Sequence, residues 1–124
     1  MIQDTLTHQK RIAFAFIATA LICFSFAAFH HGWSSYDQTK VLNLKGEIIE
    51  YSYDNPHGML KFKSDDKTWT VVLAPPSRME SRGLTESMLK AGAKATVVGY
   101  PHLKTKDEMR AERITMGEKT TELR

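Results

Sequence analysis

An uncharged apolar run at residues 12–29 constrains this chain more than any other feature. The run is 18 residues long and directly follows Lys10 and Arg11. About 20 apolar residues are needed to span a bilayer, and a cleavable signal has an apolar stretch of about 7–15 residues, so both interpretations stay open. Positive charge stays on the cytoplasmic side of a membrane, so we expect the rest of the chain to face the periplasm or the exterior.

The chain therefore divides into three expected regions. Residues 1–29 are a signal peptide or a membrane anchor, residues 30–37 are a linker of histidines and aromatic residues, and residues 38–124 are one small domain. A small-x-small sequence at residues 25–27 permits cleavage before Ala28. We expect the protein to be periplasmic if this cut occurs. Otherwise it sits in the inner membrane, with the domain on the periplasmic side.

Composition argues against several classes of function. The formal net charge is +3 and the charges are interspersed, so no basic surface for nucleic acid is expected. Cys23 is the only cysteine and lies within the apolar run, so the exported domain has neither a disulfide nor a nucleophilic cysteine. The sequence also lacks a Gly-x-Ser-x-Gly motif and a phosphate-binding loop. We expect no enzymatic activity.

Short strands dominate the pattern after residue 38. Apolar alternation predicts strands at residues 41–53, 59–63, 68–74, 94–100 and 110–116. Between the third and fourth strands we expect a turn at 77–80 and a helix at 86–90. Within the first strand the apolar phase changes at Ile48 and Ile49, just after Gly46. This indicates a bulge or bend, so we expect Gly46 to serve shape rather than chemistry.

Three strands, a helix and two further strands form the element order of an OB-fold, a five-stranded Greek-key barrel. We therefore expect a mostly β, OB-like barrel with one short helix, preceded by the N-terminal apolar signal or anchor helix. A small open sandwich is the rival architecture. Trp69 alternates with Val71 and Leu73, which predicts that its ring lies in the core.

Several residues occur in an order that resembles a known group of proteins. They are His30-His31, Tyr36-Asp37, Gly46, Asn55-Pro56-His57, Trp69, Arg82-Gly83, Leu89-Lys90-x-Gly92 and Gly99. Over residues 30 to about 120 the chain resembles an uncharacterised family, a domain of unknown function, of small exported bacterial proteins with a His-His start and an Asn-Pro-His turn. The resemblance implies a periplasmic OB-like domain with no established enzyme activity, and it carries no binding residues to transfer.

Four histidines are candidate ligands for a metal ion, with copper as the candidate metal. Cleavage beside Ala28 would place His30 or His31 third from the new N-terminus, where the amine, two amides and the imidazole can wrap Cu(II). A polar pair at the membrane boundary is the simpler account of these two residues. His57 lies in an Asn-Pro-His-Gly turn and His102 follows Pro101, and the turn alone is the simpler account of His57.

A second group of residues predicts a ligand-binding rim. Asn55 precedes His57 in the turn that joins the first two predicted strands, a customary ligand position of OB barrels. Arg78 and Arg82 lie in a proline-bounded segment on either side of Glu80 and could hold an anionic ligand. Surface pairing of the two arginines with Glu80 is the simpler alternative.

These features favour a non-catalytic, exported binding or accessory domain that takes a metal ion or a small ligand through its histidines. The alternative is a membrane-anchored interaction subunit that docks on a larger membrane or periplasmic complex. Its partners would be the membrane, through uncleaved residues 12–29, and a protein. Convergence of His30 or His31 with His57 or His102 would support the first hypothesis, and scattered histidines the second.

Overall fold

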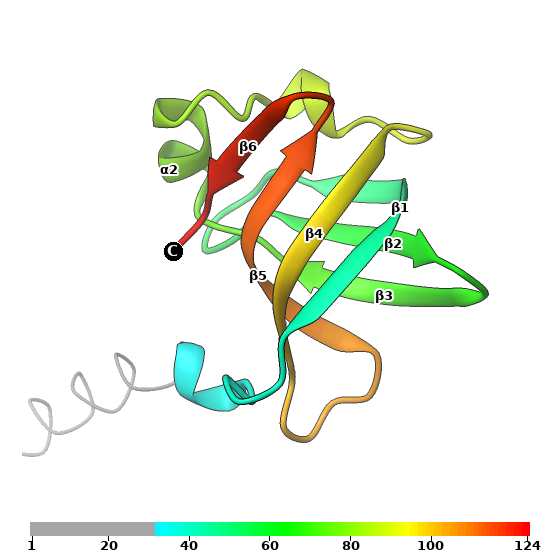
Figure 1. Cartoon of the computed structure of the whole chain (residues 1–124). Coiled ribbons are helices and arrows are strands. Elements are labelled where there is room, and N and C mark those ends of the chain that lie inside the picture. The colour runs from blue at the N-terminus through cyan, green and yellow to red at the C-terminus, as the bar shows by residue number, and fades with distance from the viewer. Residues whose placement is uncertain (1–31) are drawn as a thin grey trace, which may run out of the picture. The chain divides into compact units, whose positions relative to one another are not determined.

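In the computed structural model residues 32–124 are described, and residues 35–124 form a compact unit (Figure 1). The strands are β1 (Leu42–Ser52), β2 (Met59–Ser64), β3 (Lys67–Val72), β4 (Lys94–Pro101), β5 (Glu108–Met116) and β6 (Lys119–Glu122). The helices are η1 (Trp33–Ser35), α2 (Pro76–Ser81) and η2 (Glu86–Leu89), of which η1 and η2 are 3-10 helices. None of the helices within residues 32–124 is long and apolar enough to cross a membrane.

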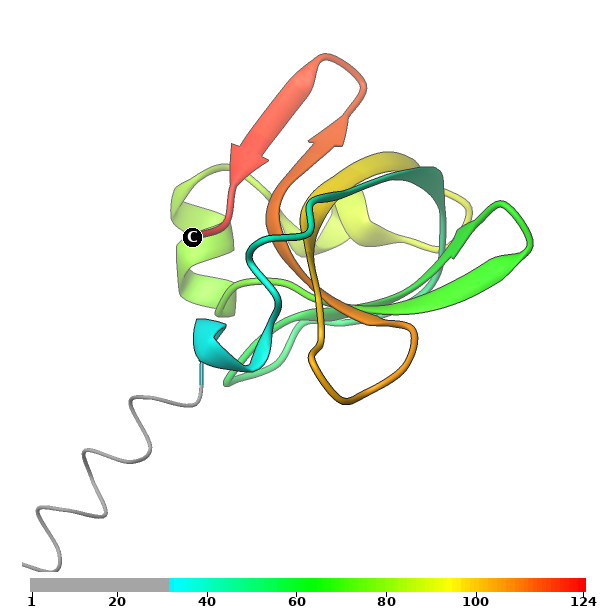
Figure 2. The ribbon, with the colours of Figure 1, turned by 60° about the horizontal axis from the view of Figure 1, so that its bottom comes forward.

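The first five strands close into a barrel, seen end-on in Figure 2. β1 pairs antiparallel with β2 and with β4, β2 pairs with β3, and β4 pairs with β5. A parallel pairing of β3 with β5 closes the ring, and β6 extends β5 outside it. The predicted mostly β, OB-like five-stranded barrel with one short helix is confirmed. The predicted N-terminal signal or anchor lies outside the described residues.

β1 is long enough to serve both sides of the barrel. Residues 42–47 pair with β4, residues 47–52 pair with β2, and the register with β2 shifts between Ile48 and Glu50. Ile48 is buried, whereas Ile49 and Tyr51 are exposed. The register shift confirms the predicted bulge or bend near Ile48 and Ile49, which lies where β1 passes from one partner strand to the other.

Gly46 lies where the backbones of β1 and β2 approach most closely. A Cβ added to Gly46 would overlap the carbonyl oxygen of Lys63 and lie 3.1 Å from the Cα of Ser64. Both neighbours are backbone atoms held by strand pairing, so they cannot move aside without loss of that pairing. The close approach, rather than an unusual backbone angle, explains why glycine occupies this position.

The segment between β3 and β4 is helical as predicted, but a different part of it forms the α-helix. Residues 77–80, expected to be a turn, lie in α2, whereas residues 86–90, expected to be the helix, form only the short η2. Pro76 suits the first turn of α2, where a backbone N–H has no partner in the helix. Met79 and Leu89 are fully buried, so each of the two helices contributes a side chain to the core.

β6 is absent from the prediction, because residues 119–122 carry no apolar alternation. Gly117, at φ 62°, allows the tight turn that folds the chain back along β5. The hydroxyls of Thr115 and Thr120 then lie 2.8 Å apart across the two strands. Leu123, just after β6, is buried in the core, so the end of the hairpin is fixed by packing rather than by strand propensity.

Trp69 lies at the edge of the core rather than within it. The fully buried aromatic side chain is that of Phe62, its partner across β2 and β3. Trp69 is partly buried against the core, and the Nζ atom of Lys67 lies 5.0 Å from its ring centroid. The predicted core position of Trp69 therefore needs correction, because the strand alternation gives the face of a side chain but not its depth.

We expect Gly46→Ala to lower the free energy of unfolding by about 1–3 kcal/mol, because the added methyl forces β1 away from β2. Gly58→Ala is the matched control. There the nearest atom is the flexible Cε end of Met79, so the loss should be smaller. Urea unfolding of both variants measures the difference, and equal losses would contradict the close-approach explanation.

We expect Phe62→Ala to cost about 3–5 kcal/mol of stability, because it leaves a cavity in the core. Trp69→Ala should cost distinctly less, since part of its ring already contacts solvent. Thermal unfolding of the two variants side by side checks the order. A larger loss for Trp69→Ala would show that its ring lies deeper than described.

Candidate functional site

A polar cluster forms where the loop between β1 and β2 meets the start of β5. It consists of Tyr36, His57, Arg78, Glu108 and Arg110, and we refer to it as the loop-end cluster. His57 comes from the β1–β2 loop, Glu108 and Arg110 come from β5, and Arg78 comes from α2. The site is therefore assembled from segments that are distant in sequence.

Arg110 is the buried member of the cluster. It alternates along β5 with the core residues Met109 and Ala111, so its side chain lies on the opposite face of the strand. Only 8% of Arg110 is exposed. Burial lowers the pKa of Arg110, and the nearby charges of Arg78 and Arg124 act in the same direction. The charges of two other arginines thus act on the buried guanidinium group of Arg110.

Arg110 determines which ring nitrogen of His57 carries the proton. The Nη2 atom of Arg110 lies 3.1 Å from Nε2 of His57. A guanidinium group can only donate, so Nε2 accepts and the proton of the neutral ring lies on Nδ1. Burial, followed by the charges of Arg110 and Arg78, lowers the pKa of His57. His57 is therefore held as a neutral ring with an N–H donor at Nδ1.

Tyr36 links the cluster to the β4–β5 connection. Its hydroxyl donates to Oε1 of Glu108 at 2.7 Å, and its ring meets that of His102 edge to face, with centroids 5.0 Å apart. Burial and the bond to Glu108 raise the pKa of Tyr36 far above its ordinary value, so the hydroxyl keeps its proton. Tyr36 therefore holds the carboxylate of Glu108, a residue that comes two positions before Arg110 in β5.

His102 is committed to local backbone contacts. Its Nδ1 atom accepts from the backbone N–H groups of Lys104 at 3.0 Å and Thr105 at 2.9 Å. A ring nitrogen that accepts carries no proton, so in the neutral ring the proton lies on Nε2. For both His57 and His102, the nitrogen with the lone pair already accepts an N–H group.

The predicted metal site through His57 and His102 is not assembled in the described part of the chain. Within residues 32–124, no three His, Cys, Asp or Glu side chains come together in an arrangement suited to a metal ion. A metal needs an unprotonated ring nitrogen, and each of these two histidines would first have to give up an existing bond. His30 and His31 lie outside the described residues, so the copper hypothesis for the N-terminus stays a prediction.

The predicted ligand rim is divided by the structure. Asn55 is exposed on the β1–β2 loop that carries His57. Nη1 of Arg78 donates to the carbonyl of Leu123, and Nη1 of Arg82 donates to the carbonyls of Glu122 and Arg124. Both arginines therefore bind the backbone at the end of β6 and just after it, whereas the predicted simpler alternative to a ligand rim is surface pairing with Glu80. Only Arg78 also acts on His57.

Arg110, Glu108 and Tyr36 are not among the site residues predicted from the sequence. Tyr36 is predicted as part of the linker at residues 30–37 and of the family resemblance. Arg110 begins the predicted strand at residues 110–116, and Glu108 precedes that strand. The one available signal is an arginine between the apolar residues Met109 and Ala111, since such a charge is rarely buried without a partner. That signal alone does not identify His57 as the partner of Arg110.

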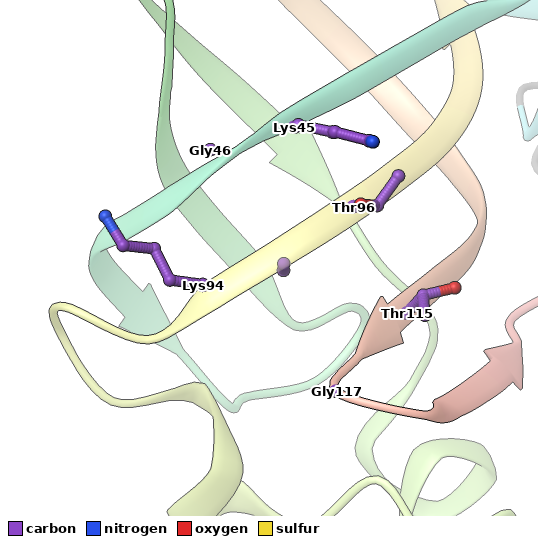
Figure 3. Close-up of a pocket in the computed structure, with 7 residues that line it drawn as sticks. Lys45, Gly46, Lys94, Thr96, Thr115 and Gly117 are labelled. Atoms are coloured by element: carbon purple, nitrogen blue, oxygen red, sulfur yellow. The ribbon is translucent and has the colours of Figure 1, made fainter.

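Two surface hollows lie on the strands, and neither is lined by a predicted metal ligand or by a residue of the predicted ligand rim. The larger, about 430 Å³, is lined by Lys45, Gly46, Lys94, Ala95, Thr96, Thr115 and Gly117 (Figure 3). The Nζ atom of Lys94 is 2.7 Å from Oε2 of Glu47, so its charge is already paired. The smaller, about 210 Å³, includes the exposed Tyr51 and Met59. Neither lining includes a histidine or a cysteine.

The fold and the loop-end cluster together define a small OB-like barrel domain with a half-buried polar site beside its β1–β2 loop. A family described as "Family of unknown function (DUF6152)" matches residues 18–110, which is most of the chain. The chain belongs to this family. The predicted resemblance to an uncharacterised family is thereby confirmed, while the family's bacterial export, its His-His start and its Asn-Pro-His turn remain predictions.

Comparison with other proteins gives similar solved structures and no curated relative. No curated protein matches this chain. Among solved structures, one similar chain belongs to the structure described as "Crystal structure of the TiaS-tRNA(Ile2)-ATP complex". The identity is 16% and the TM-score is 0.49, and the match covers 72% of this chain and 20% of that chain. This chain therefore corresponds to about a fifth of the length of that protein.

We expect the stability of the folded protein to fall in acid because of His57. The pKa of His57 is lower in the folded state than in the unfolded state, so folding favours the neutral ring. The resulting contribution to the free energy of unfolding is fully present above the unfolded-state pKa of about 6.5. It is lost progressively as the pH falls through the folded-state pKa. Urea unfolding from pH 7.5 to pH 5 should show a smaller loss for His57→Gln than for the wild type. Parallel pH profiles would contradict this account.

Proposed function

We propose that residues 35–124 act as a non-catalytic, exported binding module whose small ligand contacts the loop-end cluster. The observation that carries this proposal is the contact of His57, from the β1–β2 loop, with the buried Arg110 of β5. OB barrels customarily bind ligands with the loops after the first and fourth strands. Here the first loop supplies His57, and the second carries His102 against Tyr36.

The protonation states in the cluster support binding rather than catalysis. A general base needs an available lone pair close to its working pH. In His57 the lone pair at Nε2 faces Arg110, and its pKa is lowered by burial. In Tyr36 the raised pKa keeps the hydroxyl protonated. The cluster therefore presents fixed donors, which suit the recognition of a ligand.

One further observation favours the alternative of an interaction subunit. Ile49, Tyr51 and Met59 are large apolar residues, each about 40% exposed, and they come from β1 and β2. Tyr51 and Met59 also line the smaller surface hollow. Exposed apolar side chains that gather on neighbouring strands are typical of surfaces that contact another protein. This surface would serve a membrane-anchored subunit that docks on a larger complex.

Native mass spectrometry of the full chain, taken from its own membrane and soluble fractions, tests the proposal. We expect a retained small molecule of fixed mass. His57→Gln should lose it while the fold is kept, and Lys45→Gln, in the larger hollow, should retain it. The same masses report whether residues 1–29 are cleaved.

Three other outcomes would change the assignment. Retained copper that survives His57→Ala would place the ligand at His30 and His31. A co-purifying protein without any small ligand would support the interaction subunit. A molecule that both His57→Gln and Lys45→Gln retain would show that the loop-end cluster is not the site.

A further inference from the structure

The loop-end cluster presents hydrogen-bond donors from three different segments. The guanidinium group of Arg110 contacts His57, and this contact leaves His57 with its own donor at Nδ1. Arg78 comes from α2, and its charge acts on both His57 and Arg110. Arginine side chains have five N–H donors and no acceptor, so the single bond from Nη1 of Arg78 to the carbonyl of Leu123 uses only part of its capacity.

The arrangement of charge at this site suits an anion. Arg110 is buried and Arg78 is exposed, and the positive charge of Arg78 lowers the pKa of Arg110, so the two like charges repel each other. Arg124 adds a third positive charge, although its Nη1 atom also lies 3.9 Å from Oε1 of Glu112. A negatively charged group bound against Arg78 would relieve this repulsion, whereas a cation would increase it.

The carboxylate of Glu108 does not make the site suitable for a cation. It lies on the same face of β5 as Arg110, and its Oε1 atom accepts the hydroxyl of Tyr36 at 2.7 Å. Tyr36 is itself buried, so one oxygen of the Glu108 carboxylate is already held by a fixed donor.

We infer that the ligand of the loop-end cluster carries an oxyanion, a carboxylate or a phosphate group, which accepts hydrogen bonds from Arg78 and from Nδ1 of His57 beside Arg110. This inference rests on the proposed binding function and names the chemical class of its ligand. Guanidinium groups match both oxyanions, because their parallel N–H groups can bond two oxygens at once. A neutral imidazole N–H adds a third, directional donor without bringing an acceptor into the site.

Titration of the full chain, in a mild detergent at constant ionic strength, tests the inference. The probes are inorganic phosphate, acetate, and phosphatidylglycerol vesicles with phosphatidylcholine vesicles as the blank. Nitrogen NMR signals of the His57 ring and of the arginine side chains report binding. We expect saturable shifts of His57 and Arg110 with at least one probe. The tighter of phosphate and acetate then identifies the oxyanion, and a response to phosphatidylglycerol vesicles alone identifies a lipid headgroup as its source.

Arg78→Gln and Arg82→Gln form a matched pair for this titration. Both arginines donate to backbone carbonyls at the end of β6 or after it, but only Arg78 acts on His57. Loss of a charged hydrogen bond should weaken binding about tenfold or more in Arg78→Gln and leave Arg82→Gln within about twofold of the wild type. Thermal unfolding confirms that both variants are folded. Equal weakening by both substitutions would overturn the inference, because it would reduce the effect to general surface charge.

The wild-type titration separates this inference from the proposed function. If all three probes leave His57 unshifted while a molecule retained by the native protein shifts it, the oxyanion inference fails and the binding module stands. If the native protein retains no ligand and none of the probes shifts His57, both fail.

Discussion

The crossing of β1 from one partner strand to another is the constraint on which the rest of this structure depends. A barrel of five strands closes only if one strand is shared between its two sides. β1 does this with a shifted register after Ile48 and with a close backbone approach at Gly46. Because the approach leaves no room for a Cβ atom, the identity of one residue limits how tightly the barrel can coil. The β3–β5 pairing that completes the ring is a consequence of that coil.

Closure of the ring also creates the candidate site. The parallel register places Val72 of β3 opposite Arg110 of β5, and Gly58, next to His57, accepts a backbone hydrogen bond from Leu73. The loop after β1 and the start of β5 are therefore brought together by backbone pairing rather than by the side chains themselves. The polar contacts between His57 and Arg110 can then form without having to hold the fold together. A site built in this way can vary in chemistry while the barrel is kept.

The sequence predicts the barrel better than the site, for a physical reason. Alternation and glycine placement are local properties, so the strands and the bend near Gly46 can be predicted from neighbouring residues. The core depth of Trp69 and the hairpin that ends with Leu123 depend on distant partners, and they are predicted incorrectly or missed. The candidate site depends on distant partners even more strongly. His57 and Arg110 are 53 residues apart, and only the barrel topology brings them together.

The choice of His57 as the partner of Arg110 has a consequence for specificity. A carboxylate in that position would form a neutral pair with Arg110 and would remove the attraction for an anion. A neutral imidazole instead accepts one hydrogen bond from Arg110 while the positive charge is preserved, and it offers a further donor at Nδ1. This arrangement lowers the free energy of unfolding, because Arg110 is buried as a charge and His57 is held neutral by its surroundings. An arrangement that stabilised the fold alone would replace this pair with apolar side chains, since buried charges contribute little to stability. A charged donor beside a neutral ring therefore agrees with the proposed recognition of an anion, and packing alone does not require it.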